Sequence, residues 1–152
     1  MNLNSQLILK GNLSIKKYSK DNNLVQQLDV PNLIVNVGKQ YIASKIVGYT
    51  GSSSNVMSHM GVGSSASTPA AGNTNLNAAI VGGRIALDSS TVSGTIVTYS
   101  ATFGPGVGTG SVVEAGIFNA SSAGTMLCHT VFPVVNKDAN ETIVITWNIS
   151  VG

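Results

Sequence analysis

The feature that most constrains the fold is the regular alternation of apolar and polar residues in the second half of the chain. In the last run, residues 142–151, one face carries Ile143, Ile145, Trp147, Ile149 and Val151, and the other carries Thr142, Val144, Thr146, Asn148 and Ser150. A period of two is the period of a β-strand with one buried face. This run is therefore predicted to be a long central strand.

Similar runs precede it, separated by turn-forming residues. Strand patterns occur near residues 85–87, 96–103, 111–119 and 125–135, and turns are predicted at Ser93-Gly94, 104–110, 121–124 and 136–140. In the run 125–135, Met126, Cys128, Thr130 and Phe132 are expected on one face, and Leu127, His129 and Val131 on the other. Several strands at this spacing are typical of a β-sandwich or jelly roll.

The N-terminal region predicts a β-hairpin over about residues 6–30. Leu7, Leu9, Leu13 and Ile15 share one strand face, and residues 19–23 have turn chemistry. Gly11 predicts a bulge or bend in the first strand, and Pro31 is expected to end the second. This hairpin could extend to contact a neighbouring molecule.

Residues 36–47 are predicted to form the one helix of the chain. Asn36 is a candidate N-cap, and Gly48 is a natural C-terminal stop. An apolar stripe is expected from Val37, Tyr41, Ile42 and Ile46, while Gly38 weakens the helix by roughly 1 kcal/mol. The sequence thus predicts one mainly β domain spanning residues 1–152, β-sandwich or jelly-roll-like, with a short helix near 36–47.

Residues 63–79 are small and polar and predict a long ordered loop, with one helical turn near Leu76–Ile80. Loops of this length in compact domains usually have a function or cover something. A neighbouring subunit is one candidate for what this loop meets.

Charged residues make up only 9% of the chain, against about 25% in ordinary soluble domains. Such a surface suits a body whose faces meet other proteins, and it equally suits a secreted or low-charge β-domain. Cys128 is the single cysteine, so it has no intramolecular disulfide partner. The N-terminus lacks a signal-peptide pattern, and no stretch has the length of a membrane span. A soluble protein made in a cytoplasm is expected.

The residues that could carry chemistry show no pairing in the sequence. The acidic residues are interpreted as solvated groups in turns or at strand ends: Asp21, Asp29, Asp88, Glu114, Asp138 and Glu141. Cys128 and His129 are adjacent in a strand, so their side chains point to opposite faces. The sequence has no closely spaced zinc-ligand pair, and the glycine-rich run 104–110 lies between strands with no lysine after it. We therefore expect no enzymatic activity, no catalytic residue, no cofactor and no metal.

Most of the basic residues lie early in the chain, among them Lys10, Lys16, Lys17 and Lys20. Nucleic-acid binding would require a denser basic face, so neither nucleic acid nor a membrane is expected as a partner. The simplest interpretation of these lysines is a solvated strand face. A negatively charged protein partner near the N-terminus is the alternative.

Four segments give the chain a resemblance to a known family. They are HMGVG (His59–Gly63), TPAAGNTNL (residues 68–76), EAGIFNA (Glu114–Ala120) and TVFPVVNK (residues 130–137) followed by ITW. Over roughly residues 25–151, the order of segments resembles a family of small virion proteins of tailed bacteriophages, described as structural or tail-fibre-like.

The resemblance implies a place in the virion, assembled in the bacterial host cytoplasm, and not a reaction. The resemblance leaves the capsid and the tail open as locations. Because 152 residues hold neither a long fibre shaft nor a large receptor-binding tip, we expect a capsid cement or decoration protein that binds the outside of the major capsid shell, as a homotrimer. Lys10, Lys16, Lys17 and Lys20 are then candidates for contact with an acidic stretch of the major capsid protein. The alternative is a tail, neck or tail-fibre component involved in host contact.

Overall fold

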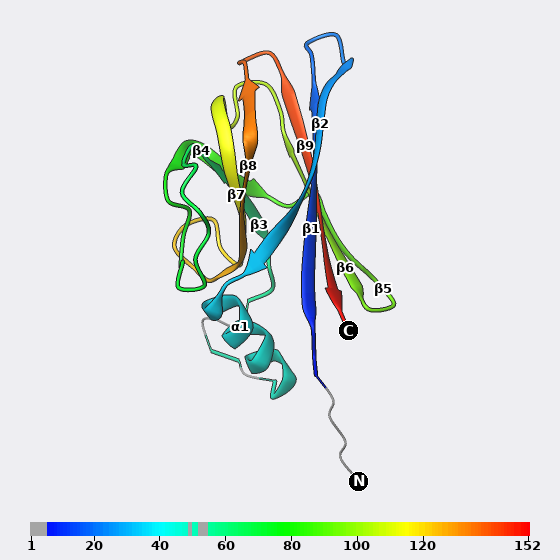
Figure 1. Cartoon of the computed structure of the whole chain (residues 1–152), viewed down its shortest axis with the longest axis vertical. Coiled ribbons are helices and arrows are strands. Elements are labelled where there is room, and N and C mark those ends of the chain that lie inside the picture. The colour runs from blue at the N-terminus through cyan, green and yellow to red at the C-terminus, as the bar shows by residue number, and fades with distance from the viewer. Residues whose placement is uncertain (1–5, 49, 52–54) are drawn as a thin grey trace.

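The chain forms a mainly β structure with one short helix, as the sequence predicts (Figure 1). The computed structural model describes residues 6–48, 50–51 and 55–152. Its elements are β1 (Leu9–Tyr18), β2 (Leu24–Ile34), α1 (Asn36–Ile46), β3 (His59–Gly63), β4 (Ala79–Ala86), β5 (Ser89–Ser93), β6 (Ile96–Phe103), β7 (Gly110–Phe118), β8 (Met126–Lys137) and β9 (Thr142–Val151). In the described part of the chain, no helix is long and apolar enough to cross a membrane.

All nine strands belong to one antiparallel sheet in the order β4-β3-β7-β8-β2-β1-β9-β6-β5. The sheet curls at β2, whose first part pairs with β1 and whose last two residues, Leu33 and Ile34, pair with β8. We call β5-β6-β9-β1-β2 half-sheet A, and β4-β3-β7-β8 half-sheet B. The two halves face each other as in a sandwich, although the sheet is continuous (Figure 1).

The hydrophobic core lies between the two halves. Half-sheet A supplies Leu13, Ile15, Phe103, Ile145 and Trp147, and half-sheet B supplies Met60, Val62, Ile117, Cys128 and Phe132. The predicted inward face of β9 is confirmed from Ile143 to Ile149, and β9 is central because it pairs with both β1 and β6. The N-terminal hairpin is confirmed as β1 and β2, and its inner residues belong to this core.

Two expectations for the hairpin are wrong. Pro31 does not end β2, which continues to Ile34. Its carbonyl accepts a hydrogen bond from Thr130 of β8, so its N also faces away from β1 and the missing N–H costs the β1–β2 ladder nothing. Gly11 causes no bulge, because the register of β1 is continuous there. Its lack of a side chain instead makes room for Asn32, whose Oδ1 would lie 1.5 Å from a Cβ at that position.

Helix α1 confirms the predicted element but not all of its details. Val35, not Asn36, is the N-cap, and no side chain caps the helix. The Asn36 amide instead donates to the carbonyl of Ala71 in the long loop. Gly38 is no weakness, since a Cβ there would lie 2.0 Å from the backbone oxygen of Leu127. The helix therefore packs directly on β8.

The C-terminal end of the apolar stripe differs from the prediction too. Tyr41 and Ile42 pack against the core, but Ile46 is 77% exposed. Gly48 follows the helix with φ +66°, which confirms the predicted stop.

The alternation predicted for residues 125–135 holds for Cys128 and Phe132, which face the core, but it is wrong at Met126 and Leu127. The register with β7 shifts between Ile117 and Phe118, which leaves Leu127 as an extra residue. Met126 therefore faces outward, where it packs with Phe118, and Leu127 faces the core.

Candidate functional site

The four candidate lysines do not act as one group. Lys10, Lys16 and Lys20 are exposed, the first two on β1 and the third in the β1–β2 turn. Lys17 instead binds residues of its own chain, since its Nζ lies 2.8 Å from the carbonyl of Asn136 and 3.2 Å from Oε2 of Glu141. The pKa of Glu141 is lowered, mainly by the hydrogen bond from the Asp138 amide and further by Lys17. Lys17 therefore joins the hairpin to the β8–β9 turn.

A buried acid and histidine meet on the outer face of half-sheet B. Glu114 of β7 and His129 of β8 both have fully buried side chains, and Oε2 lies 2.8 Å from Nε2. The prediction that all the acidic residues are solvated is therefore wrong at Glu114. Glu114 pairs with Val131 and His129 with Gly116, so the two side chains are diagonal neighbours on one face of adjacent strands. The sequence shows no sign of this register.

This pair holds the long loop. Glu114 accepts hydrogen bonds from the amides of Asn77 at 3.0 Å and Ala78 at 2.7 Å, and His129 Nδ1 lies 3.1 Å from Oδ1 of Asn73. The same Asn73 oxygen accepts from the Ala70 amide at 2.7 Å. We call Glu114, His129 and Asn73 the loop anchor, because their hydrogen bonds hold residues 64–78 against the sheet.

The hydrogen bonds also constrain the protonation of the loop anchor. Because the Asn73 oxygen already accepts from an amide, and Glu114 accepts from two, both ring nitrogens of His129 face acceptors. One proton on Nδ1 satisfies the contact with Asn73, and one proton between Nε2 and Oε2 of Glu114 satisfies the other. The carboxyl group of Glu114 completes its hydrogen bonds with backbone amides, which is what burial of such a group requires.

Glycines make the close approach of the loop possible. A Cβ on Gly63 would lie 2.4 Å from Oε1 of Glu114 and 2.6 Å from the carbonyl of Ala78. Cβ atoms on Gly61 and Gly116 would lie 3.3 Å and 3.1 Å from the methyl groups of Leu76. Leu76 packs there with Val35, Phe118 and Met126 in a second apolar cluster.

The predicted ordered loop thus covers the molecule's own sheet. The predicted helical turn at Leu76–Ile80 is wrong, since residues 76–78 bend into the loop anchor and β4 begins at Ala79.

The geometry of the loop anchor fits a structural role. The side chains of Glu114 and His129 are inaccessible to solvent, and their hydrogen-bonding atoms contact other groups of the protein. Three cavities on the described residues are lined by neither Glu114 nor His129. Cys128 points to the opposite, core side, as the sequence predicts, and burial raises the pKa of its thiol.

No group of three or more His, Cys, Asp or Glu residues that could hold a metal occurs among the residues that the structure describes.

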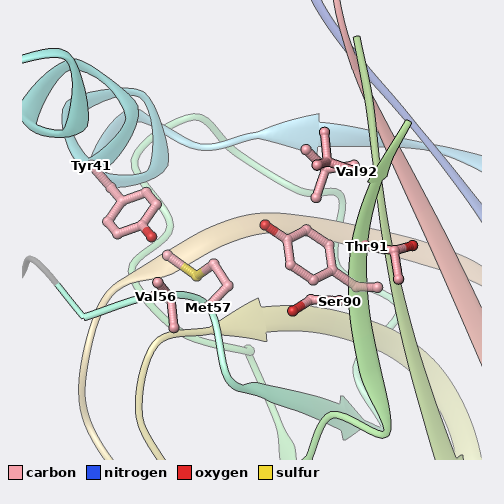
Figure 2. Close-up of a pocket in the computed structure, with 8 residues that line it drawn as sticks. Tyr41, Val56, Met57, Ser90, Thr91 and Val92 are labelled. Atoms are coloured by element: carbon pink, nitrogen blue, oxygen red, sulfur yellow. The ribbon is translucent and has the colours of Figure 1, made fainter. Parts of the chain in front are cut away.

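A groove opens at the end of the sandwich that carries α1 and the β5–β6 turn (Figure 2). It has a volume of about 240 Å³ and is lined by Tyr41, Val56, Met57, Ser90, Thr91, Val92, Val97 and Tyr99. Burial raises the pKa of Tyr99 to about 12. Val56 is 70% and Val92 72% exposed, so the rim of the groove presents apolar side chains to the surroundings.

Other large apolar side chains gather at the same end, which we call the apolar end. The amide of Gly152 donates to the carbonyl of Ile8 and that of Val151 to the carbonyl of Thr95, so the start of β1 and the β5–β6 turn lie on either side of the end of β9. Most of the exposed large hydrophobic residues in the described ranges belong here: Leu7, Ile8, Ile46, Val47, Val56, Val92 and Ile96. The opposite end, with the β1–β2 and β8–β9 turns, carries Lys17, Lys20, Asp21, Asp138 and Glu141 (Figure 1).

Comparisons with known protein families, with curated proteins and with solved structures found no match for this chain.

Proposed function

We propose that this protein is a structural component of a bacteriophage virion, a cement or decoration protein that binds the outside of the major capsid shell. The virion setting comes from the resemblance of segments such as HMGVG and EAGIFNA. The adhesive role comes from one observation, the concentration of exposed apolar side chains at the apolar end. Large apolar patches on a protein surface mark sites of interaction.

The composition and the loop anchor agree with a role in adhesion. Few charges on the body would limit repulsion between crowded copies on a shell. The loop anchor uses the only buried acid–histidine pair among the described residues to hold the chain's own loop. Many repeated contacts of modest affinity are sufficient for cement, because the shell presents its sites in a fixed geometry. A homotrimer remains our prediction for the assembled form.

Particles lacking the protein provide the test. Shells made without it should lose integrity at lower temperature and at low salt, and adding the purified protein should restore the resistance of complete particles. Equal resistance of the two kinds of particle would overturn the cement role. The number of copies per virion separates the locations: hundreds indicate the capsid, whereas three to about eighteen would indicate the tail or neck instead.

A trimer can be tested independently of any particle. Light scattering of the purified protein coupled to size exclusion should give three times the mass of one chain. A monomer at all concentrations would mean that copies associate only on the particle or not at all.

A further inference from the structure

The two edges of the sheet are built differently. β4 is an irregular edge: Gly82 has φ +69°, and the pairing with β3 shifts register between Gly61 and Gly63. Such kinks and bulges prevent a further strand from pairing with an edge. β5 has a continuous register with β6 over all five of its residues and contains no proline, glycine or charged side chain. It therefore lacks the devices that keep an edge from pairing.

The hairpin geometry identifies the backbone groups that β5 presents. Gly94, with φ +57°, and Thr95 form a two-residue turn that closes on the Ser93–Ile96 pair. Hydrogen-bonded pairs then alternate along the hairpin, so Ser89, Thr91 and Ser93 face β6. Ser90 and Val92 point their N–H and C=O groups away from the sheet.

The groove at the apolar end lies beside this edge. Ser90 and Val92 line it from β5, while Tyr41, Val56 and Met57 line its opposite side (Figure 2). A strand added to β5 would place every second side chain on this inner face. The edge and the groove together therefore fit an extended segment with apolar residues at alternate positions.

The charges near the groove favour an acidic segment. None of the residues that line it is a carboxylate. Helix α1 contains no acid and places Lys45 at the groove, with Nζ 5.1 Å from the centre of the Tyr41 ring, whereas Lys39 of the same helix lines another cavity. Asp88, which immediately precedes β5, is the acidic residue nearest to this strand in the sequence. Its carboxylate accepts a hydrogen bond from Thr102 at 2.7 Å.

A second copy of this chain does not supply such a segment from either of its sheet edges. β5 offers one large apolar side chain, Val92, and no acid. β4 is kinked and carries Arg84 rather than a carboxylate.

We propose that β5 and its groove take up an extended, acidic segment of a partner protein as an additional strand of the sheet. This mode of binding uses main-chain hydrogen bonds for affinity and side-chain pockets for selectivity. Naming the major capsid protein as the source of the segment rests on the proposed function. The edge itself does not depend on it.

A synthetic peptide tests the edge directly. The probe is a capped seven-residue peptide, Val-Glu-Val-Glu-Val-Glu-Val, compared with a twin in which Lys replaces Glu. On titration to millimolar concentration, the amide NMR signals of Ser90 and Val92 should shift with the Glu peptide, and the Lys twin should bind at least about tenfold more weakly. No shift at these residues, or equal binding of both peptides, would overturn the proposal.

A matched pair of variants distinguishes the edge from other surfaces. Val92→Lys adds a charge on the groove side of β5. Thr91→Lys adds the same charge at a residue that also borders the groove but whose side chain points away from it (Figure 2). Val92→Lys should weaken binding of the Glu peptide at least about tenfold, and Thr91→Lys about twofold or less. Equal effects, or dimers of the wild-type protein that Val92→Lys abolishes, would contradict a partner strand at this edge. Thermal unfolding of both variants checks that the fold is intact.

Binding to shells separates this inference from the proposed function. Val92→Lys should bind depleted capsids with at least about tenfold lower affinity than the wild type. If the variant binds capsids normally, the capsid protein is not the source of the added strand, and the cement role stands. If the wild type binds the Glu peptide but not capsids, the cement role fails and the edge proposal stands.

Discussion

The outer faces of the two half-sheets differ in what covers them. On half-sheet A, the outward side chains of β1, β6 and β9 are mostly polar, as in the hydrogen bond between Thr98 and Asn148, with Ile96 and Val144 as apolar exceptions. On half-sheet B, the loop 64–78 covers the outer face, and β7 is buried on both sides from Glu114 to Phe118. A sheet covered on one side tolerates change on the other, whereas a sheet covered on both sides does not.

The largest difference is expected from the loop anchor. Glu114→Gln removes the charge that faces His129 and turns an amide donor toward backbone donors, so the free energy of unfolding should fall by about 3 kcal/mol. Thr98→Val on the outer face of half-sheet A should change it by less than about 0.5 kcal/mol. Urea unfolding measures both. Comparable losses would show that the two faces do not differ in this way.

A glycine substitution sharpens the comparison at one position. Gly63→Ala puts a methyl group against Glu114 and the Ala78 carbonyl, and moving the backbone of the loop should cost about 2 kcal/mol. Gly104→Ala, where nothing lies within 4 Å, is the control and should be close to neutral. Hydrogen exchange should accelerate at the Asn77 and Ala78 amides in Gly63→Ala only. If these amides exchange as slowly as in the wild type, the missing side chain at Gly63 is not what allows the loop to approach the sheet.

The smallest effect concerns the buried phenol of half-sheet A. Burial raises the pKa of Tyr99 to about 12, whereas in the unfolded chain it is about 10. Its contribution to stability is therefore complete below pH 10 and is lost as the pH rises from 10 to 12. The loss is on the order of 1 kcal/mol once the partial exposure of the ring is allowed for.

Tyr99→Phe tests this contribution. It should flatten the fall in melting temperature between pH 10 and 12, and Tyr41→Phe provides a comparison, since burial raises the pKa of that phenol too. An unchanged slope in Tyr99→Phe would assign the alkaline loss to another group.

The same contrast explains what could be predicted from the sequence. Half-sheet A has one buried face, so the alternation along β1, β6 and β9 identifies the strands and their inward residues, except at Leu7, which precedes β1 and is 63% exposed. In β3, in β7 from Glu114 and in the first part of β8 both faces are covered, so apolar residues and glycines occupy both, and the period of two is lost in β3 and interrupted at Leu127. The helix can be predicted because Tyr41 follows Val37, and Ile46 follows Ile42, at a spacing of four residues.

The loop anchor was not predictable by the same reasoning. Glu114 and Asn77 are far apart in sequence, and their contact depends on the glycines at 61, 63 and 116 as well as on the register of β7 with β8. The resemblance segments offered the one signal, since HMGVG, TPAAGNTNL and EAGIFNA contain Gly63, Asn73 and Glu114. In the structure these segments lie against one another.

The position of β9 between β1 and β6 has a consequence for folding during synthesis. β1 pairs with β9 along its whole length, from Leu9 with Val151 to Tyr18 with Thr142. On the ribosome β1 can pair with β2 as soon as that strand is made, but β9, its partner on the other side, is made only after all the strands between them. Until then Leu13 and Ile15 have no finished core to enter, and such nascent apolar strands are prone to aggregate. Half-sheet A should therefore be the last part of the molecule to form, and chaperones should bind the growing chain mainly through β1 and β6.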